Sequence, residues 1–344
     1  MTAFLIASLT GCASGDTENA ASDSSPMSQT TDDQSLADSA IISDNSYADT
    51  TVSPNNSYVD TAVSPDDSHT EKEASVKEIC PENVVAVSKS IADLWLLSGG
   101  SLSGTTEDAM ELEGITENTA VIGTLSRPNI EAILALSPDL VLLTEDIPSQ
   151  KELKTELEDM DILALAIDIN SFEDYMACMD ELTDMTGRKD LYEQNAVEVS
   201  ERIKKILETA KASGGSLDTE KKTFLAMRVS ATKNKALKDD YFACEIFRDF
   251  GLVNIAEENN SLDELNLEAI AAADPDYIFV IPQGGESEAM ESYRTQFEEN
   301  PVWRELGAVK ENRLFIMPKE YFQYKPNAQW DTAYEYVYQL LREA

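Results

Sequence analysis

The chain contains one sixteen-residue segment twice, as PNIEAILALSPDLVLL from Pro128 to Leu143 and as LNLEAIAAADPDYIFV from Leu265 to Val280. Seven positions are identical at one constant offset. Each copy predicts a short amphipathic helix, a Pro-Asp turn that the helix cannot pass, and an apolar strand buried on both faces of a parallel sheet. We therefore expect two similar α/β halves.

The sequence around the two copies alternates between strand and helix patterns. Predicted strands cover residues 84–87, 121–123, 140–143 and 162–167 in the first half, and residues 223–229, 277–281 and 313–317 in the second. Helical patterns lie between them, which is typical of mainly parallel sheets covered by helices. Ser261 and Glu264 have the spacing of a capping box for the second repeated helix.

A proline-free segment separates the halves. Apolar residues keep helical spacing from Leu191 to Ala210, and a helix of this length spans about 35 to 40 Å. The prediction is two Rossmann-like lobes joined by one long α-helix. Its boundaries are residues 80–186 for the first lobe, 187–213 for the helix, and 214–344 for the second lobe with a closing helix.

The front of the chain has a different composition. Residues 1–12 are predicted to be a lipoprotein signal remnant. Its apolar run from Phe4 to Leu9 ends in Leu9-Thr10-Gly11-Cys12, the pattern of a bacterial lipoprotein cleavage site, so Cys12 is the predicted lipidation site. Residues 13–79 are rich in Ser, Thr and Asp, with 14 acidic and two basic residues, and predict a disordered tether. We expect attachment to the outer face of the cell membrane through the lipid alone, since no stretch has the apolar length of a membrane span.

Charge and residue usage exclude several functions. A formal charge of −39 without a polybasic strip argues against nucleic-acid binding. The single histidine, His69, lies in the tether, so the folded part has no histidine for a catalytic triad or a zinc site. Cys80, Cys178 and Cys244 are too few and too far apart for a disulfide framework. We expect no cofactor and no directly bound metal.

With these features in this order, the chain resembles the solute-binding lipoproteins of ABC importers that carry ferric siderophores, haem and cobalamin. The resemblance rests on the lipobox at Cys12, the repeated segment, the long helix after Thr186, and the motif Asn300-Pro-Val-Trp303, and it covers about Val84 to the C-terminus. It implies a monomer, without catalytic activity, that captures a ligand between two lobes and delivers it to a permease dimer. It also implies that Glu131 and Glu268, one on each lobe, dock into that permease. Capping of each helix dipole by its glutamate is the alternative reading.

The ligand is expected beyond the carboxyl ends of the strands, where two facing lobes form one cleft. The candidates are side chains in the loops that follow strands: Ser88, Ser90, Arg127, Arg228, Gln283, Lys319, Tyr321, Tyr324 and Lys325. Their basic members predict a positive pocket for an anionic metal chelate, and the two tyrosines could stack on its rings. A ferric siderophore is the preferred ligand.

Other interpretations stay open at this point. Haem could be held by tyrosinate at Tyr321 or Tyr324, and nothing in the sequence excludes cobalamin. A surface enzyme could use carboxylates such as Glu145 and Asp146 for acid-base chemistry. A ligand-sensing surface lipoprotein would have the same lobes without a permease.

Overall fold

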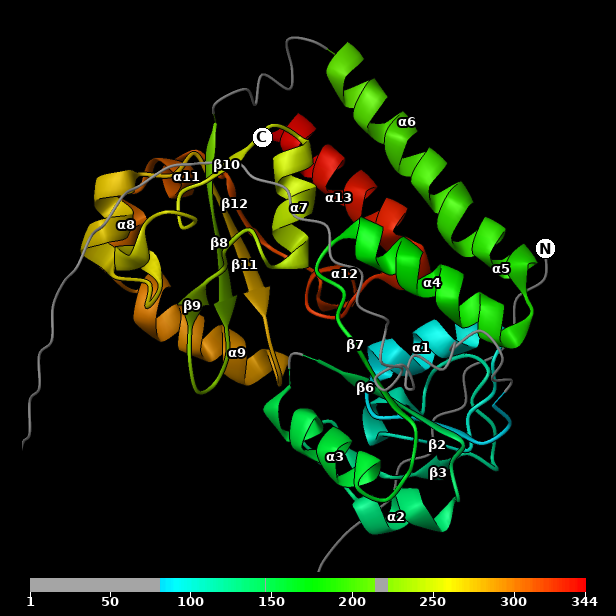
Figure 1. The fold of residues 1–344 in the computed structure, drawn as a ribbon. Helices are drawn as coiled ribbons and strands as arrows, with labels where there is room; N and C mark the ends of the chain where they lie inside the picture. The colour runs from blue at the N-terminus through cyan, green and yellow to red at the C-terminus, as the bar shows by residue number, and fades with distance from the viewer. Residues whose placement is uncertain (1–80, 146, 214–221) are drawn as a thin grey trace, which may run out of the picture. The chain divides into compact units, whose positions relative to one another are not determined.

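The computed structural model describes residues 81–145, 147–213 and 222–344 (Figure 1). These ranges belong to one compact unit of the chain. The predicted lipobox, the lipidation at Cys12 and the tether lie outside the described residues. No helix in the described ranges is long and apolar enough to cross a membrane.

The first lobe is built on a parallel sheet with the strand order β3-β2-β1-β6-β7. Its strands are β1 (Val84–Ala86), β2 (Gly104–Thr105), β3 (Ala120–Val121), β6 (Leu140–Thr144) and β7 (Ala164–Ile167). An antiparallel hairpin joins β4 (Gly123–Thr124) to β5 (Arg127–Pro128). The helices are α1 (Lys89–Leu97), α2 (Ile130–Ala135), α3 (Pro148–Glu158) and α4 (Phe172–Thr186), with a 3-10 turn η2 (Glu107–Ala109).

The second lobe repeats this plan with the order β10-β8-β11-β12, and β9 pairs antiparallel with β8. Its strands are β8 (Thr223–Val229), β9 (Lys235–Ala236), β10 (Val253–Asn254), β11 (Tyr277–Pro282) and β12 (Leu314–Ile316). Its helices are α7 (Phe242–Asp249), α8 (Leu267–Ala273), α9 (Glu286–Tyr293), α10 (Pro301–Arg304), α11 (Gly307–Lys310), α12 (Lys319–Phe322) and α13 (Trp330–Glu343). Shorter helical turns are η4 (Asn260–Leu262), the π turn η5 (Arg294–Glu298) and η6 (Asn327–Gln329).

The repeated segment occupies equivalent places in both lobes, as α2 before β6 and as α8 before β11. The shared asparagine begins each helix: Asn129 accepts a hydrogen bond from the backbone N–H of Ala132 at 3.2 Å, and Asn266 accepts one from Ala269 at 3.0 Å. The predicted capping box is therefore wrong. Ser261 lies in η4, one turn too early, because Asn266 takes the capping role.

The shared aspartate of the Pro-Asp turn ties two strands together in each lobe. Asp139 Oδ2 accepts hydrogen bonds from the backbone N–H groups of Glu82 and Asn83, which precede β1. Asp276 Oδ2 accepts one from Thr223, the first residue of β8, at 2.8 Å. The same residue thus fixes the start of the neighbouring parallel strand in both lobes.

The predicted long helix is present and contains a π turn. After α4 ends at Gly187, which has φ of 69°, the chain continues as α5 (Lys189–Tyr192), the π turn η3 (Glu193–Val197) and α6 (Glu198–Ala212). The first lobe holds this turn: Tyr175 Oη donates to the Asn195 carbonyl at 2.7 Å, and Asn195 Nδ2 donates to the Leu97 carbonyl at 2.9 Å. The boundaries at residues 186 and 213 remain predictions.

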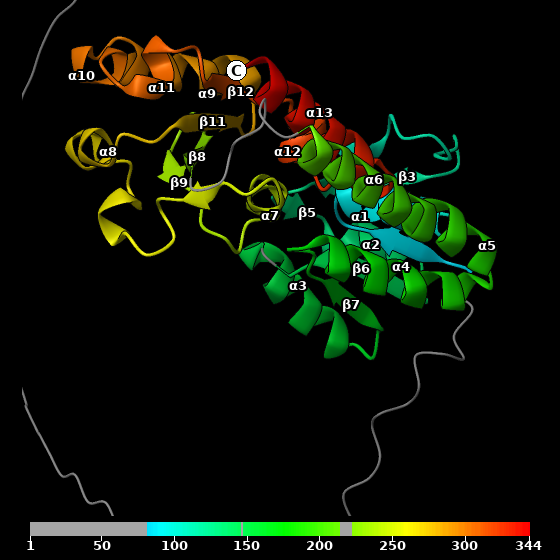
Figure 2. The ribbon, with the colours of Figure 1, turned by 90° about the horizontal axis from the view of Figure 1, so that it is seen from above.

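Alternate residues of the central strands face different hydrophobic cores. Val85 and Val141 pack under α2 and α3, and the equivalent faces of β8 and β11 pack in a second cluster with α8 and α9. Val84 and Leu140 belong instead to a third, large core that also contains residues of β8, β11, α6, α7 and α13. Helices α6 and α13 lie side by side in it (Figures 1 and 2). The two lobes therefore share one continuous apolar core.

Candidate functional site

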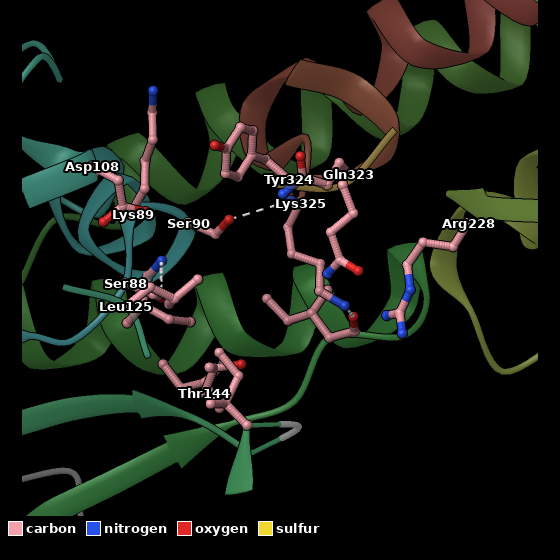
Figure 3. Close-up of a pocket in the computed structure, with 15 residues that line it drawn as sticks. Ser88, Lys89, Ser90, Asp108, Leu125, Thr144, Arg228, Gln323, Tyr324 and Lys325 are labelled. Carbon is pink, nitrogen blue, oxygen red and sulfur yellow. Dashed lines mark hydrogen bonds between the residues drawn. The ribbon is translucent and has the colours of Figure 1, made fainter. Parts of the chain in front are cut away.

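The candidate site is a cavity of about 200 Å³ where the strand ends of both lobes meet (Figure 3). Such a position, beyond the carboxyl ends of parallel strands, is where open α/β sheets bind ligands. The cavity is lined by Ser88, Lys89, Ser90, Ile91, Asp108, Leu125, Thr144, Ile147, Ile167, Ile169, Arg228, Gln283, Gln323, Tyr324 and Lys325.

The first-lobe wall is the junction between β1 and α1. Ser88 has an extended backbone with φ of −163°, and its Oγ accepts a hydrogen bond from the backbone N–H of Ile91, so it caps α1. Ser90 is the second residue of the helix, and its Oγ accepts a hydrogen bond from the backbone N–H of Lys325 at 3.3 Å. The helix start thus meets the second lobe directly.

Arg228 enters the cavity from the penultimate position of β8. It lies opposite Ser88 and Ser90 in Figure 3. Its Nε is buried without a hydrogen-bond partner, and no ion pair joins its guanidinium to any described residue. Gln283 follows the neighbouring strand β11, and its backbone N–H donates to Val229 at 2.8 Å. A guanidinium left unpaired in a strongly acidic protein is suited to an anionic ligand.

The segment after α12 joins the lobes. The Lys325 ammonium donates to the carbonyl of Ile169 in the first lobe and lies 4.9 Å from the ring centroid of Phe242. Two residues later, Asn327 Nδ2 donates to the Ser90 carbonyl at 2.9 Å and to Asp93 Oδ2 at 2.7 Å. Lys325 therefore lines the cavity while its charge contacts a first-lobe carbonyl.

A second cavity of about 390 Å³ adjoins the first and shares Lys89, Ser90, Tyr324 and Lys325 with it. Lys319 lines it, and its ammonium donates to the Gly284 carbonyl. The Tyr324 ring lies between two ammonium groups, 5.4 Å from Lys89 and 6.0 Å from Lys319. Burial, followed by the charge of Asp108, raises the pKa of Tyr324, so its phenol is protonated at neutral pH.

The carboxyl group of Asp93, which is partly buried, lines this second cavity. Burial raises the pKa of Asp93, against the opposing effects of the hydrogen bond from Asn327 and the charge of Lys89. The residues that the structure describes contain no group of three or more His, Cys, Asp or Glu side chains arranged to hold a metal ion.

The structure brings six of the predicted ligand residues into the first cavity, namely Ser88, Ser90, Arg228, Gln283, Tyr324 and Lys325. Lys319 lines only the second cavity. Arg127 lies exposed in the β4–β5 hairpin, and Tyr321 packs against the shared core, so neither of these two lines either cavity.

Among the polar and charged residues of the first cavity, sequence reasoning missed Lys89, Asp108, Thr144 and Gln323. Lys89 stands between two predicted residues and could have been included with them. Asp108 lies in a 3-10 turn after β2, where the sequence has no periodic pattern to mark a strand end. Gln323 follows α12 directly, beside the predicted Tyr324.

The other predicted residues lie outside the cavities. Glu131 and Glu268 are exposed at the second position of α2 and α8 respectively. Glu145 pairs with Lys151 at 3.1 Å, and Asp146 lies outside the described residues.

Comparison with known proteins gives consistent results. Residues 84–321 match the model of a family described as periplasmic binding protein. The Fe(3+)-citrate-binding protein YfmC of Bacillus subtilis is 25% identical over 242 residues, covering 68% of this chain and 72% of that protein. The iron-uptake system-binding protein of the same species is 23% identical over 276 residues, covering 77% of this chain and 75% of that protein. The crystal structure of Staphylococcus aureus IsdE complexed with heme superposes with a TM-score of 0.63 at 18% identity, covering 74% of this chain and 98% of that one.

Proposed function

Because the chain belongs to the periplasmic binding protein family, we propose that it captures a ferric chelate between its lobes outside the cytoplasm and delivers it to an ABC permease. It is a binding protein and not an enzyme, so the carboxylates at positions 145 and 146 need no catalytic role. The proposed ligand class follows the names of its curated relatives, which bind ferric citrate or serve iron uptake.

The single observation that carries the ligand assignment is the unpaired guanidinium of Arg228 in the cavity wall. Among the described residues of this acidic chain, twelve of 23 Lys and Arg side chains form an ion pair with a carboxylate. Arg228 has none among the described residues, and Lys89 lines the same cavity. Carboxylate or catecholate oxygens of an iron chelate would complete its hydrogen bonds.

Haem is the second candidate, because Tyr324 places a phenol in the cavity wall. A tyrosinate can bind haem iron. The raised pKa of Tyr324 works against this, since the phenol must lose its proton to become a good ligand. We therefore rank haem below an anionic ferric chelate.

Titration of the purified protein with ferric citrate, a ferric tris-catecholate, haemin and cyanocobalamin tests the assignment. We expect saturable binding of an anionic ferric chelate, followed by tryptophan fluorescence. Arg228→Ala should weaken this binding by about 10- to 150-fold, the range for a hydrogen bond to a charged group. Arg304→Ala changes an exposed arginine of the same lobe and should have no effect. Equal affinity of Arg228→Ala and the wild type would place the ligand elsewhere.

We further propose that Glu131 and Glu268 dock into the permease, with Cys12 carrying the lipid anchor of a monomer. Two exposed carboxylates at equivalent points of two similar lobes suit a two-fold symmetric partner. The double variant Glu131→Ala with Glu268→Ala should retain ligand binding and lose uptake into cells.

The matched control for docking is Glu111→Ala with Glu258→Ala, which removes one exposed carboxylate from each lobe elsewhere. Normal uptake by the docking double variant would refute the docking role of these two glutamates. Replacing Cys12 by Ser should release the protein from the membrane fraction, and unchanged fractionation would refute the anchor.

A further inference from the structure

The two adjoining cavities differ in size. The first has a volume of about 200 Å³ and the second about 390 Å³. Pockets that bury a small-molecule ligand usually have about 300 to 1,000 Å³. The cavity at the strand ends is therefore small for such a ligand when taken alone, whereas the two cavities joined would lie well within this range.

Tyr324 is the aromatic residue that the walls of both cavities share. Two other shared residues, Ser90 and Lys325, are tied together across the lobes by a hydrogen bond, and the Lys325 ammonium also donates to the carbonyl of Ile169. The half-buried Tyr324 ring lacks such a tie, because its phenol oxygen makes no hydrogen bond with any described residue. Rotation of this one ring would therefore break no hydrogen bond.

Two ammonium groups hold the Tyr324 ring in its present place. Lys89 is the first residue of α1 in the first lobe, and its ammonium lies 5.4 Å from the ring centroid. Lys319 is the first residue of α12 in the second lobe, and its ammonium lies 6.0 Å away. In Figure 3 the Lys89 side chain extends alongside the ring. A ring face attracts an ammonium group more weakly than an anionic oxygen does, so an anion in the second cavity would compete with the ring for both cations.

The acidic side chains of the second cavity leave these cations available. Neither Lys89 nor Lys319 forms an ion pair with a carboxylate in the part of the chain that the structure describes. Asp93 receives the amide N–H of Asn327 at 2.7 Å, and Glu320 is exposed. Lys319 donates to a backbone carbonyl, which uses one of its three N–H donors.

We infer that the two cavities form one binding site, that Tyr324 is the movable wall between them, and that the ligand is a bulky chelate with anionic oxygens at both ends. This inference rests on the proposed function and names the size class of its ligand. Arg228 receives the oxygens in the first cavity, and Lys89 and Lys319 receive those in the second. A chelate small enough for the first cavity alone would not reach Lys319.

Lys319 provides the binding test, because it lines the second cavity and not the first. The probe is a ferric tris-catecholate, titrated into the full-length protein and followed by tryptophan fluorescence. Lys319→Met keeps an unbranched apolar side chain and should weaken binding by about 10- to 150-fold, as Arg228→Ala does. The matched control is Lys310→Met, a change at an exposed lysine of the same lobe, which should leave binding unchanged.

A second measurement addresses the wall itself. Tyr324→Ala removes the ring and should speed the association of the tris-catecholate by about 5- to 30-fold in stopped-flow fluorescence, the range for giving up two weak contacts between a cation and a ring. Tyr324→Phe keeps the ring and should associate at the wild-type rate. A rate in Tyr324→Ala equal to that of the wild type would show that the ring does not separate the cavities, which overturns the inference.

The binding data can also overturn the inference. Weaker binding in Arg228→Ala with no change in Lys319→Met would confine the ligand to the first cavity, and the reverse result would confine it to the second. Binding of ferric citrate without binding of the tris-catecholate would refute the bulky ligand and leave the carrier function standing. Failure of every ferric chelate would instead refute the proposed function.

Discussion

Replacing Asp276 by Asn should weaken the second lobe at the point where β8 begins. Asp276 Oδ2 accepts hydrogen bonds from the backbone N–H of Thr223 at 2.8 Å and from its Oγ1 at 3.1 Å, and Asp276 Oδ1 lies 3.2 Å from Lys222 Nζ. An asparagine keeps the shape and loses the charge. It also turns an N–H donor either toward the Lys222 ammonium or toward the backbone N–H of Thr223, both of which are donors.

The magnitude follows from the exposure of these partners. The Asp276 side chain is 28% exposed and that of Lys222 44% exposed, so their ion pair adds only about 0.5 kcal/mol. Hydrogen bonds from Thr223 to a charged, largely shielded acceptor contribute about 2 kcal/mol. The expected loss is therefore about 2 to 3 kcal/mol, or roughly 5 to 10 °C in the midpoint for a chain of this size.

The pH dependence has a definite sign. Burial pushes the pKa of Asp276 upward, but the hydrogen bonds from Thr223 and Lys222 outweigh it and hold the pKa below the ordinary value of 3.8. A carboxyl group whose pKa is lowered in the folded state stabilises it above the unfolded pKa, and this contribution disappears as the pH falls through the folded pKa. The difference between wild type and Asp276→Asn should be constant from pH 7 to about pH 5 and shrink below about pH 4.

Equilibrium urea unfolding at a series of pH values measures this difference. Asp139→Asn, at the equivalent position of the first lobe, should lose less, about 1 kcal/mol, because its two backbone bonds are exposed and no cation accompanies them. Glu264→Gln, at an exposed ion pair, should change stability by less than about 0.5 kcal/mol. The reasoning would be refuted if Asp276→Asn had the same free energy of unfolding as the wild type at pH 7. It would also be refuted if the difference between them were as large at pH 3 as at pH 7.

Two further predictions concern buried groups. Asn327→Ala should lower the free energy of unfolding by about 2 to 4 kcal/mol, because it removes hydrogen bonds to Ser90 and Asp93 from a residue that is 1% exposed. A decrease of less than about 0.5 kcal/mol in urea unfolding would contradict this. Burial raises the pKa of Cys178 to about 12 and that of Cys244 well above its ordinary value, so both should stay as thiols at pH 8 and resist iodoacetamide until the protein unfolds. Peptide mass spectrometry measures the alkylation, and rapid labelling of either cysteine in the native protein would be the contrary result.

The fold could be predicted because the same local signals occur twice. Asn129 and Asn266 cap equivalent helices, and the aspartates at 139 and 276 fix equivalent strand starts. The asparagines act on residues three positions away, so these caps are local, whereas the aspartates reach strands more than 50 residues away. Both kinds of contact recur at equivalent places because the same residues occur in both copies of the segment. The π turn at Glu193–Val197 was not predictable, since its stability depends on contacts with Tyr175 and Leu97, which are distant in sequence.

The cavity could be predicted best where a strand end supplies its wall. Arg228 and Gln283 follow the two central strands of the second lobe, and the strand-end rule found both. The same rule failed to bring Arg127 into the cavity, because a hairpin after β3 leads it to the surface. Tyr321 lies in α12 and packs against the shared core, to which the adjacent Phe322 belongs, so its ring does not line the cavity. The place of Asp108 in the cavity wall depends on the 3-10 turn η2, which no sequence pattern predicts.

The π turn in the connecting helix takes up one residue more than the same stretch of α-helix, because its hydrogen bonds join residues five apart and not four apart. Val199, Ile203 and Ala210, the buried residues of α6, therefore keep their packing against α13 although the chain before them is one residue longer. Deleting one residue from Glu193–Val197 should convert the turn to regular α-helix and leave this face in place. A one-residue deletion within α6 has no such turn to absorb it, would rotate the following residues by about 100°, and should be far more damaging.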